Sequence, residues 1–343
     1  MSFALAGLVV AVVLIYAFIN GFHDGGNVLA TMISSQAISI HHAFFIGAIS
    51  EFIGAFFFGG AIAKTISTGI VNPYLISIWA VITGLLGAIV WNLITWWWGF
   101  PSSSSHALIG GLLGASAIDS FLIKGQIWQV IYWHNLIWIF IVLFTSPFIG
   151  LSLGFVFTRL MFFIGRGLSP RVNETFKRLQ VLSSIFIGIS HGSNDAPKAM
   201  GIILISLMIL GIYHQKSFYV PFWVVLVCAL SFSFGVFKAS RRLIKTLGID
   251  LYKIRPVHGF ISQTGSALIV GLSSLTGFPV STTQIVNSSV MGVGAGNRIK
   301  AIRWGVVRSI FITWLVTIPG AAAIAIFFYL IIYWITGLSV IGS

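Results

Sequence analysis

Long apolar runs separated by short polar segments recur along the whole chain. A helix that spans a membrane needs about 20 predominantly apolar residues. Helical runs near or above this length are expected at 2–38, 43–63, 76–98, 127–158, 179–212, 218–237, 257–276 and 306–337. A lipid-facing β-barrel would instead show alternating segments of about ten residues. The pattern predicts an all-α polytopic membrane protein, with the polar segment 64–73 as a loop.

The composition agrees with this prediction. Of the 343 residues, 57% are hydrophobic and 7% are charged, whereas a soluble domain carries about 25% charged residues. Most of the positive charge lies in three short segments between apolar runs. These segments contain Arg159, Arg166, Arg171, Lys177 and Arg178; Lys238, Arg241, Arg242, Lys245, Lys253 and Arg255; and Arg298, Lys300, Arg303 and Arg308. Basic loops of this kind are typical of the cytoplasmic side of a membrane protein, so the net charge of +13 does not indicate a nucleic-acid partner.

Two pairs of motifs indicate an internal repeat. The segment Gly21–Asn27 and the segment Gly192–Lys198 share the pattern Gly-x-x-Asp inside otherwise apolar runs, with their aspartates 171 positions apart. A second pair, Gly-Phe-Pro followed by serines and threonines, begins at Gly99 and Gly277, 178 positions apart. Both pairs occur in the same order at nearly the same offset, which favours two related halves.

The basic loops predict how these halves are oriented. If all three lie inside the cell, each half makes three net crossings plus a hairpin, and the halves have opposite orientations. We therefore predict two inverted-topology repeats with broken helices and helical hairpins. The first transmembrane repeat covers residues 1–160, a basic cytoplasmic linker covers 161–178, and the second, inverted transmembrane repeat covers 179–343. Both termini are expected outside a multi-pass protein of the cell (plasma) membrane.

Acidic residues are rare, and three of the six lie inside apolar runs: Asp24, Glu51 and Asp195. An ionisable group in a membrane span is costly and by default marks an ion or substrate path. Two glycines beside Asp24 weaken a helix, so an unwound or kinked point is expected there. The remaining acids, Asp119, Glu174 and Asp250, are expected to be solvated in loops.

The two hydroxyl clusters are candidate anion sites. Proline followed by serine or threonine predicts helix starts near Ser104 and Thr282, and the N-terminus of a helix attracts anions. A single cluster is more often a plain cap or a packing feature, but its repetition favours binding. The predicted substrate-binding residues are Ser103, Ser104, Ser105, Ser281, Thr282 and Thr283.

The two Gly-x-x-Asp motifs are candidate coupling sites. Asp24 with Asn27, and Asp195 with Asn194, offer oxygen ligands for Na⁺, or the carboxylates can take up a proton. Lys198 stands where the first repeat has Asn27, so its ammonium can pair with Asp195. The predicted cation- or proton-coupling residues are Asp24, Asn27, Glu51, Asn194, Asp195 and Lys198. For Glu51 a helix-bridging role is equally consistent with the sequence.

Three histidines, His23, His106 and His191, border the motifs. They can relay protons or donate to an anion, although a single buried histidine is more often structural. The chain has no Walker-type glycine-lysine loop, so ATP drive is not supported. No cofactor is expected besides the coupling H⁺ or Na⁺.

Taken together, these motifs resemble the PiT family of inorganic phosphate transporters, in particular its shorter bacterial members. The resemblance covers both halves and is carried by Gly21–Asn27, Trp91-Asn92, Pro101–His106, His191–Lys198 and Pro279–Thr283. It implies an inverted-repeat fold, a homodimer in membrane lipid, and phosphate moved with H⁺ or Na⁺. It also implies that Asp24, Asn27, Asn194 and Asp195 handle the cation, and that Ser104, Ser105, Thr282 and Thr283 contact phosphate.

Within this resemblance, Glu51 matches a glutamate of the second span that is important in the family. The chain departs from the pattern at two places. Gln263 stands where many members have a second-half glutamate, and Gln284 replaces a histidine that often follows the Ser-Thr-Thr run. Some short members are similar to sulfate permeases.

The favoured function is thus a secondary active transporter that imports inorganic phosphate in symport with H⁺ or Na⁺. A sulfate permease of the same fold is the alternative within this class. An intramembrane phosphatase or phosphotransferase is the alternative from another class, but it would need an acid to orient Ser105 and His106. A passive anion channel is disfavoured, because acids at the midplane repel anions unless a cation is bound.

Overall fold

The computed structural model describes residues 2–124, 128–165, 172–213 and 218–336, and these residues are almost entirely helical. The first half contains α1 (Ser2–Ser34), α2 (Ile40–Phe58), α3 (Gly60–Gly69), α4 (Ile78–Trp98), α5 (Ser104–Lys124) and α6 (Trp133–Ile164). The second half contains α7 (Val172–Ile209), α8 (Phe222–Phe237), α9 (Arg241–Lys245), the π-helix η1 (Thr246–Leu251), α10 (Pro256–Thr276), α11 (Thr282–Arg298), the 3₁₀-helix η2 (Ile299–Ala301) and α12 (Trp304–Thr336).

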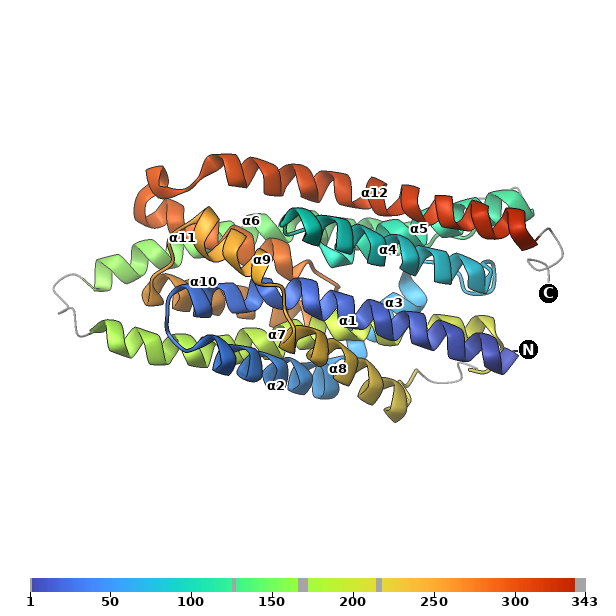
Figure 1. Ribbon diagram of the computed structural model, residues 1–343, viewed down its shortest axis with the longest axis horizontal. Helices are drawn as coiled ribbons and strands as arrows, with labels where there is room; N and C mark the ends of the chain where they lie inside the picture. The colour runs from blue at the N-terminus through green and yellow to red at the C-terminus, as the bar shows by residue number, and fades with distance from the viewer. Residues whose placement is uncertain (1, 125–127, 166–171, 214–217, 337–343) are drawn as a thin grey trace.

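The helices form an elongated bundle whose long axis follows most of them (Figure 1). Among the described residues, α1, α2, α4, α5, α6 and α12 are each long and apolar enough to cross a membrane. A further candidate span combines α8 with the segment Arg241–Leu251, bent by 58° at the break between them. The prediction of an all-α polytopic membrane fold is confirmed.

Two helical hairpins approach the middle of the bundle from opposite ends. Helices α4 and α5 lie toward the right of Figure 1, and α10 and α11 toward the left. Each hairpin bends after a glycine with a left-handed backbone, Gly99 (φ 72°) and Gly277 (φ 78°), a conformation that favours glycine. The tips meet, since the Ser105 hydroxyl donates a 3.0 Å hydrogen bond to the carbonyl of Val280.

The repeat is visible in how the helices pack across the two halves. A Cβ added to Gly21 of α1 would lie 2.1 Å from the Phe232 carbonyl of α8. A Cβ added to Gly192 of α7 would lie 2.0 Å from the Glu51 carbonyl of α2. The same close approach thus recurs at corresponding positions, and in each case a helix of one half packs on a helix of the other. The halves are interlocked rather than side by side.

The expected break at the Gly-x-x-Asp motifs is wrong, because α1 and α7 run unbroken through them. The glycines instead permit close packing. A Cβ on Gly25 would meet Val236 at 3.0 Å, and one on Gly26 would meet the Ser240 carbonyl at 3.2 Å. Packing of this kind offsets the helix penalty of about 1 kcal/mol per glycine. The helices are instead interrupted at the hairpin tips and between α8 and α9.

Two further expectations need correction. The segment 64–73 is not a loop throughout, because α3 extends to Gly69. Asp119 is not solvated: it is fully buried in α5. It accepts hydrogen bonds from the Ser77 hydroxyl and the Tyr329 hydroxyl, both at 2.5 Å. These neutral donors stabilise a buried carboxylate that would otherwise be costly. Glu174 and Asp250 are 70% and 35% exposed, as expected.

The segments that carry most of the basic residues adjoin one end of the bundle. The end of α6 and the starts of α7, α10 and α12 lie toward the left of Figure 1, opposite the start of α1 and the end of α12. Residues 166–171 of the predicted basic linker, including Arg166 and Arg171, lie outside the described residues. The repeat boundaries and the side of the membrane on which each end lies stay predictions.

Candidate functional site

The two motif aspartates meet at the centre of the bundle. Asp24 on α1 and Asp195 on α7, together with His191, each offer a ligand atom, and these atoms lie within 4.8 Å of one another. All three residues are buried, with at most 2% of their surface exposed. Sequence positions 171 residues apart therefore form one site, placed where the hairpin tips converge.

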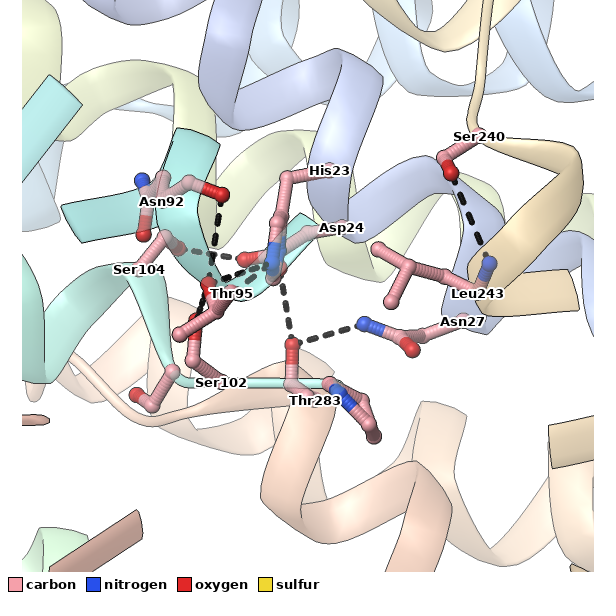
Figure 2. Close-up of polar contacts among 12 residues, drawn as sticks. His23, Asp24, Asn27, Asn92, Thr95, Ser102, Ser104, Ser240, Leu243 and Thr283 are labelled. Atoms are coloured by element: carbon pink, nitrogen blue, oxygen red, sulfur yellow. Dashed lines mark hydrogen bonds and ion pairs between the residues drawn. The ribbon is translucent and has the colours of Figure 1, made fainter. Parts of the chain in front are cut away.

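In the first half of this site, Asp24 collects donors from three different elements (Figure 2). The Ser104 hydroxyl of the first hairpin and the Thr283 hydroxyl of the second both donate to its carboxylate, the latter at 2.9 Å. His23 Nδ1 lies 2.7 Å from the same carboxylate. Asn27 donates to the Thr283 hydroxyl at 2.9 Å. Hydroxyl groups of both tips are thus oriented toward the Asp24 carboxylate.

In the second half, Asp195 is paired with the ammonium of Lys198. Lys198 also donates to the Ser105 hydroxyl at 2.5 Å and to the Val280 carbonyl at 3.3 Å. Ser105 belongs to the first hairpin tip and Val280 to the second. The lysine therefore connects α7 with both tips.

A buried chain of ionisable groups continues from Asp195. His191 Nε2 lies 2.8 Å from the Asp195 carboxylate, and His191 Nδ1 lies 2.9 Å from Glu51. The corresponding positions of the first half do not form such a chain. Asn20 corresponds to His191 by the repeat offset. Phe232 corresponds to Glu51, because its carbonyl packs on Gly21 as the Glu51 carbonyl packs on Gly192. The two halves share a backbone arrangement but differ in charge.

The other predicted hydroxyls have less central places. Ser103 and Ser281 accept hydrogen bonds from the backbone N–H of His106 and Gln284, at 3.2 and 3.3 Å. They cap α5 and α11 and confirm the predicted helix starts. Thr282 is buried with no hydrogen-bond partner for its hydroxyl.

Asn194 also contacts a hairpin tip. It lies beside the backbone of Val280, with its carboxamide 3.3 Å from the Val280 N–H. The structure therefore places the predicted residues in or around the tips, except Glu51, which is connected to them only through His191 and Asp195. The hydroxyls of Ser104 and Thr283 bond directly to Asp24, and the ammonium of Lys198 and the ring of His191 contact Asp195.

Several site residues were missed from the sequence. Tyr16 and Asn20 lie two turns and one turn before Asp24 on α1, and their buried polar side-chain atoms have no hydrogen-bond partner in the described part of the chain. The side-chain amides of Asn92 on α4 and Asn287 on α11 are likewise buried and unpartnered. Intervals of four residues place Tyr16, Asn20 and Asp24 on one helix face. This spacing is the sequence signal that could have identified Tyr16 and Asn20.

The oxygen ligands in the first half of the site suit a hard monovalent cation. Asp24 supplies a carboxylate, and the buried Oδ1 atoms of Asn27 and Asn20 have no hydrogen-bond partner within the part of the chain that the structure describes. Unpartnered buried acceptors are expensive unless water or an ion satisfies them. In the second half the ammonium of Lys198 already satisfies the corresponding acid.

The chain is similar to known phosphate transporters. The chain matches the phosphate transporter family over residues 20–168 and again over residues 165–325. It is 37% identical to a "Probable low-affinity inorganic phosphate transporter" of Rhizobium meliloti, over 96% of this chain and 97% of that protein. It is 38% identical to a protein of the same description from Bacillus subtilis, over 95% and 96% of the two chains.

A solved structure described as "The sodium-dependent phosphate transporter" has the same fold. Its TM-score is 0.86 at 24% identity, with 97% of this chain and 100% of that chain covered. The two family matches correspond to the two halves of the chain. Because these relatives are transporters, the sequence-based alternative of a phosphatase or phosphotransferase is set aside. The chain belongs to the phosphate transporter family.

Proposed function

We propose that this protein is a secondary active transporter that imports inorganic phosphate in symport with H⁺ or Na⁺. One observation carries the proposal: hydroxyl groups of both hairpin tips, those of Ser104 and Thr283, donate to the same buried carboxylate, that of Asp24. The donors are neutral, and each tip precedes the N-terminus of a helix. Hydroxyls at helix N-termini offer an oxyanion neutral donors, while the ammonium of Lys198 beside the tips is already paired with Asp195.

The carboxylate also favours phosphate over sulfate. Phosphate near neutral pH keeps a P–OH group that can donate a hydrogen bond to Asp24, whereas sulfate has only acceptors. Sulfate beside this carboxylate would leave two acceptors facing each other. A buried, unsatisfied acceptor costs about 1–3 kcal/mol, so the site is expected to discriminate against sulfate.

A cation at Asp24 and Asn27 would couple the two fluxes. Phosphate and the carboxylate repel each other in a buried site, and a cation between their oxygens removes this repulsion. Each ligand therefore strengthens the binding of the other. The description of the structural neighbour names sodium, which makes Na⁺ the first cation to test, with H⁺ as the alternative.

The arrangement of the hairpins suits alternating access. The hairpins approach the central site from opposite ends (Figure 1), so movement of one opens the site to one side only. The basic end is proposed to face the cytoplasm, with both termini outside the plasma membrane. A homodimer, surrounding lipid and the absence of a cofactor other than the coupling ion stay predictions.

The proposal is tested by uptake of radiolabelled phosphate into proteoliposomes that hold the purified protein. A sodium gradient and a proton gradient are imposed separately, with unlabelled sulfate as competitor. Uptake that follows one gradient and persists in excess sulfate supports phosphate symport and identifies the cation. Uptake of labelled sulfate in place of phosphate, or phosphate flux independent of both gradients, contradicts it.

A further inference from the structure

The two halves of the site place their motif residues in corresponding positions, and one of the exchanges between them is Asn27 for Lys198. In the first half, Asp24 and Asn27 of α1 contact Thr283 of the second hairpin. In the second half, Asp195 and Lys198 of α7 take the places of Asp24 and Asn27. Ser105, the counterpart of Thr283, receives the bond from Lys198. Asparagine in one repeat thus corresponds to lysine in the other.

The ammonium of Lys198 is held as a free cation would be. It contacts a carboxylate oxygen of Asp195, the hydroxyl of Ser105 and the carbonyl of Val280. Carboxylate, hydroxyl and carbonyl oxygens are the ligands that hard cations prefer. The side chain is 1% exposed. Its nitrogen occupies the position between these oxygens, which leaves no room for a second cation.

Lys198 is not placed to bind phosphate. An ammonium has three N–H donors and no acceptor, and the three contacts to Asp195, Ser105 and Val280 use all of them. A direct bond to a substrate would require one of these contacts to break. The lysine therefore neutralises the acid and positions the two hairpin tips.

At the position of Lys198 the first half has the neutral Asn27. Asp24 is contacted by the neutral hydroxyls of Ser104 and Thr283 and by His23, and Asn27 Oδ1 has no hydrogen-bond partner among the described residues. A buried carboxylate without a positive partner is strongly destabilised. The position that the ammonium of Lys198 fills beside Asp195 is thus open to a cation from solution only in the first half.

We propose that Lys198 is a built-in substitute for a transported cation, so that only the first half takes up a cation from solution. This inference rests on the proposed function of phosphate symport. A tethered ammonium balances Asp195 in every cycle but never leaves the protein. Substitution of Lys198 by asparagine would give the second half the residues Asp and Asn that the first half has. The protein would then carry one more cation per phosphate.

The decisive measurement is the number of charges moved per phosphate, from reversal potentials in proteoliposomes with set phosphate and cation gradients. Lys198→Asn is expected to raise this number by one, whether the added cation is Na⁺ or H⁺. Lys177→Asn is the matched control, because Lys177 lies on the same helix but at the surface, paired with Glu174. It removes the same charge and should leave the number unchanged.

Three results separate the possible failures. If the unmodified protein shows no phosphate uptake under any gradient, the proposed function is wrong. If it transports phosphate but Lys198→Asn leaves the charge number unchanged, only the role of Lys198 is wrong. A variant that merely weakens phosphate binding, with an unchanged charge number, would identify Lys198 as a substrate ligand and also overturns the inference.

A second variant covers the case in which Lys198→Asn does not fold. Asn27→Lys places an ammonium beside Asp24, and it should abolish the dependence of phosphate uptake on the cation gradient. Direct counting of bound ²²Na⁺ on the purified, unmodified protein is independent of any variant. More than one bound sodium per chain at the site, lost on Asn27→Lys, would contradict the inference.

Discussion

Thr65 of α3 donates a 2.6 Å hydrogen bond to the carbonyl of Gly277, where α10 ends before the second hairpin tip. The other half repeats this bond, because Thr246 donates at 2.9 Å to the carbonyl of Gly99 before the first tip. Each short segment of one repeat thus anchors the hairpin of the other. These two bonds hold the hairpins at the points where they bend.

Loss of one anchoring bond should loosen one hairpin only. A neutral hydrogen bond contributes about 1 kcal/mol, so Thr65→Ala is expected to raise amide hydrogen exchange around Gly277 about fivefold. The region around Gly99 should not change. Thr68→Ala is the control, since Thr68 lies on the same short helix and bonds to Lys64 of its own helix. Equal exchange in the two variants would show that the Thr65 bond does not restrain the hairpin.

Asp24→Asn preserves the size of the side chain but removes the charge that Ser104 and Thr283 bond to. Hydrogen bonds to charged groups are worth about 1.5–3 kcal/mol, so gradient-driven phosphate uptake should fall about 10- to 100-fold. Initial rates in proteoliposomes measure this. Asp250→Asn, which affects a partly exposed acid near Arg303, should keep the normal rate. Gradient-driven uptake retained by Asp24→Asn would exclude Asp24 as the coupling acid.

Tyr329→Phe removes a 2.5 Å hydrogen bond to the buried Asp119. The carboxylate would keep its bonds from Ser77 but lose the one from α12. We expect a loss of stability of about 1.5–3 kcal/mol, the contribution of one hydrogen bond to a charged group, seen as a lower thermal unfolding midpoint in detergent. Tyr333→Phe, one turn later on α12, serves as the comparison. An equal midpoint for both variants would argue against a stabilising role for this bond.

Gly54→Ala tests the close packing between α2 and α7. The added Cβ would lie 1.9 Å from the carbonyl of Ile189, so the helices must separate, at a cost of about 1–3 kcal/mol or more. Lower yield of monodisperse protein on size exclusion is the expected result. Gly60→Ala has no atom within 4 Å of its new Cβ and should behave normally. Normal yield from both variants would contradict the tight packing.

The helices and the residues of the site were largely predictable from the sequence. Hydropathy and helix-capping residues act over a few neighbours, so the helix starts at Ser104 and Thr282 followed directly from Pro101 and Pro279. The repeated motifs also indicated that distant segments have equivalent places. Repetition in the sequence thus predicted equivalent places for Asp24 and Asp195, whereas their meeting in one site appears only in the structure.

Other features depended on which surfaces meet. Glycines beside Asp24 suggested an unwound helix, but contact with Val236 keeps α1 regular. Asp119 looked like a loop residue until Ser77 and Tyr329, far away in the sequence, enclosed it. Local sequence cannot report such contacts, because their free energy comes from groups on other elements.

The sequence by itself determined the membrane class, the two related halves and the residue types of the site. Only the tertiary structure decided the partners: Ser105 and Val280 around Lys198, Glu51 beside His191, and Thr65 on Gly277. The physical reason is that composition and periodicity record how each segment meets lipid. The pairing of buried polar groups is selected by their mutual geometry after the helices have packed.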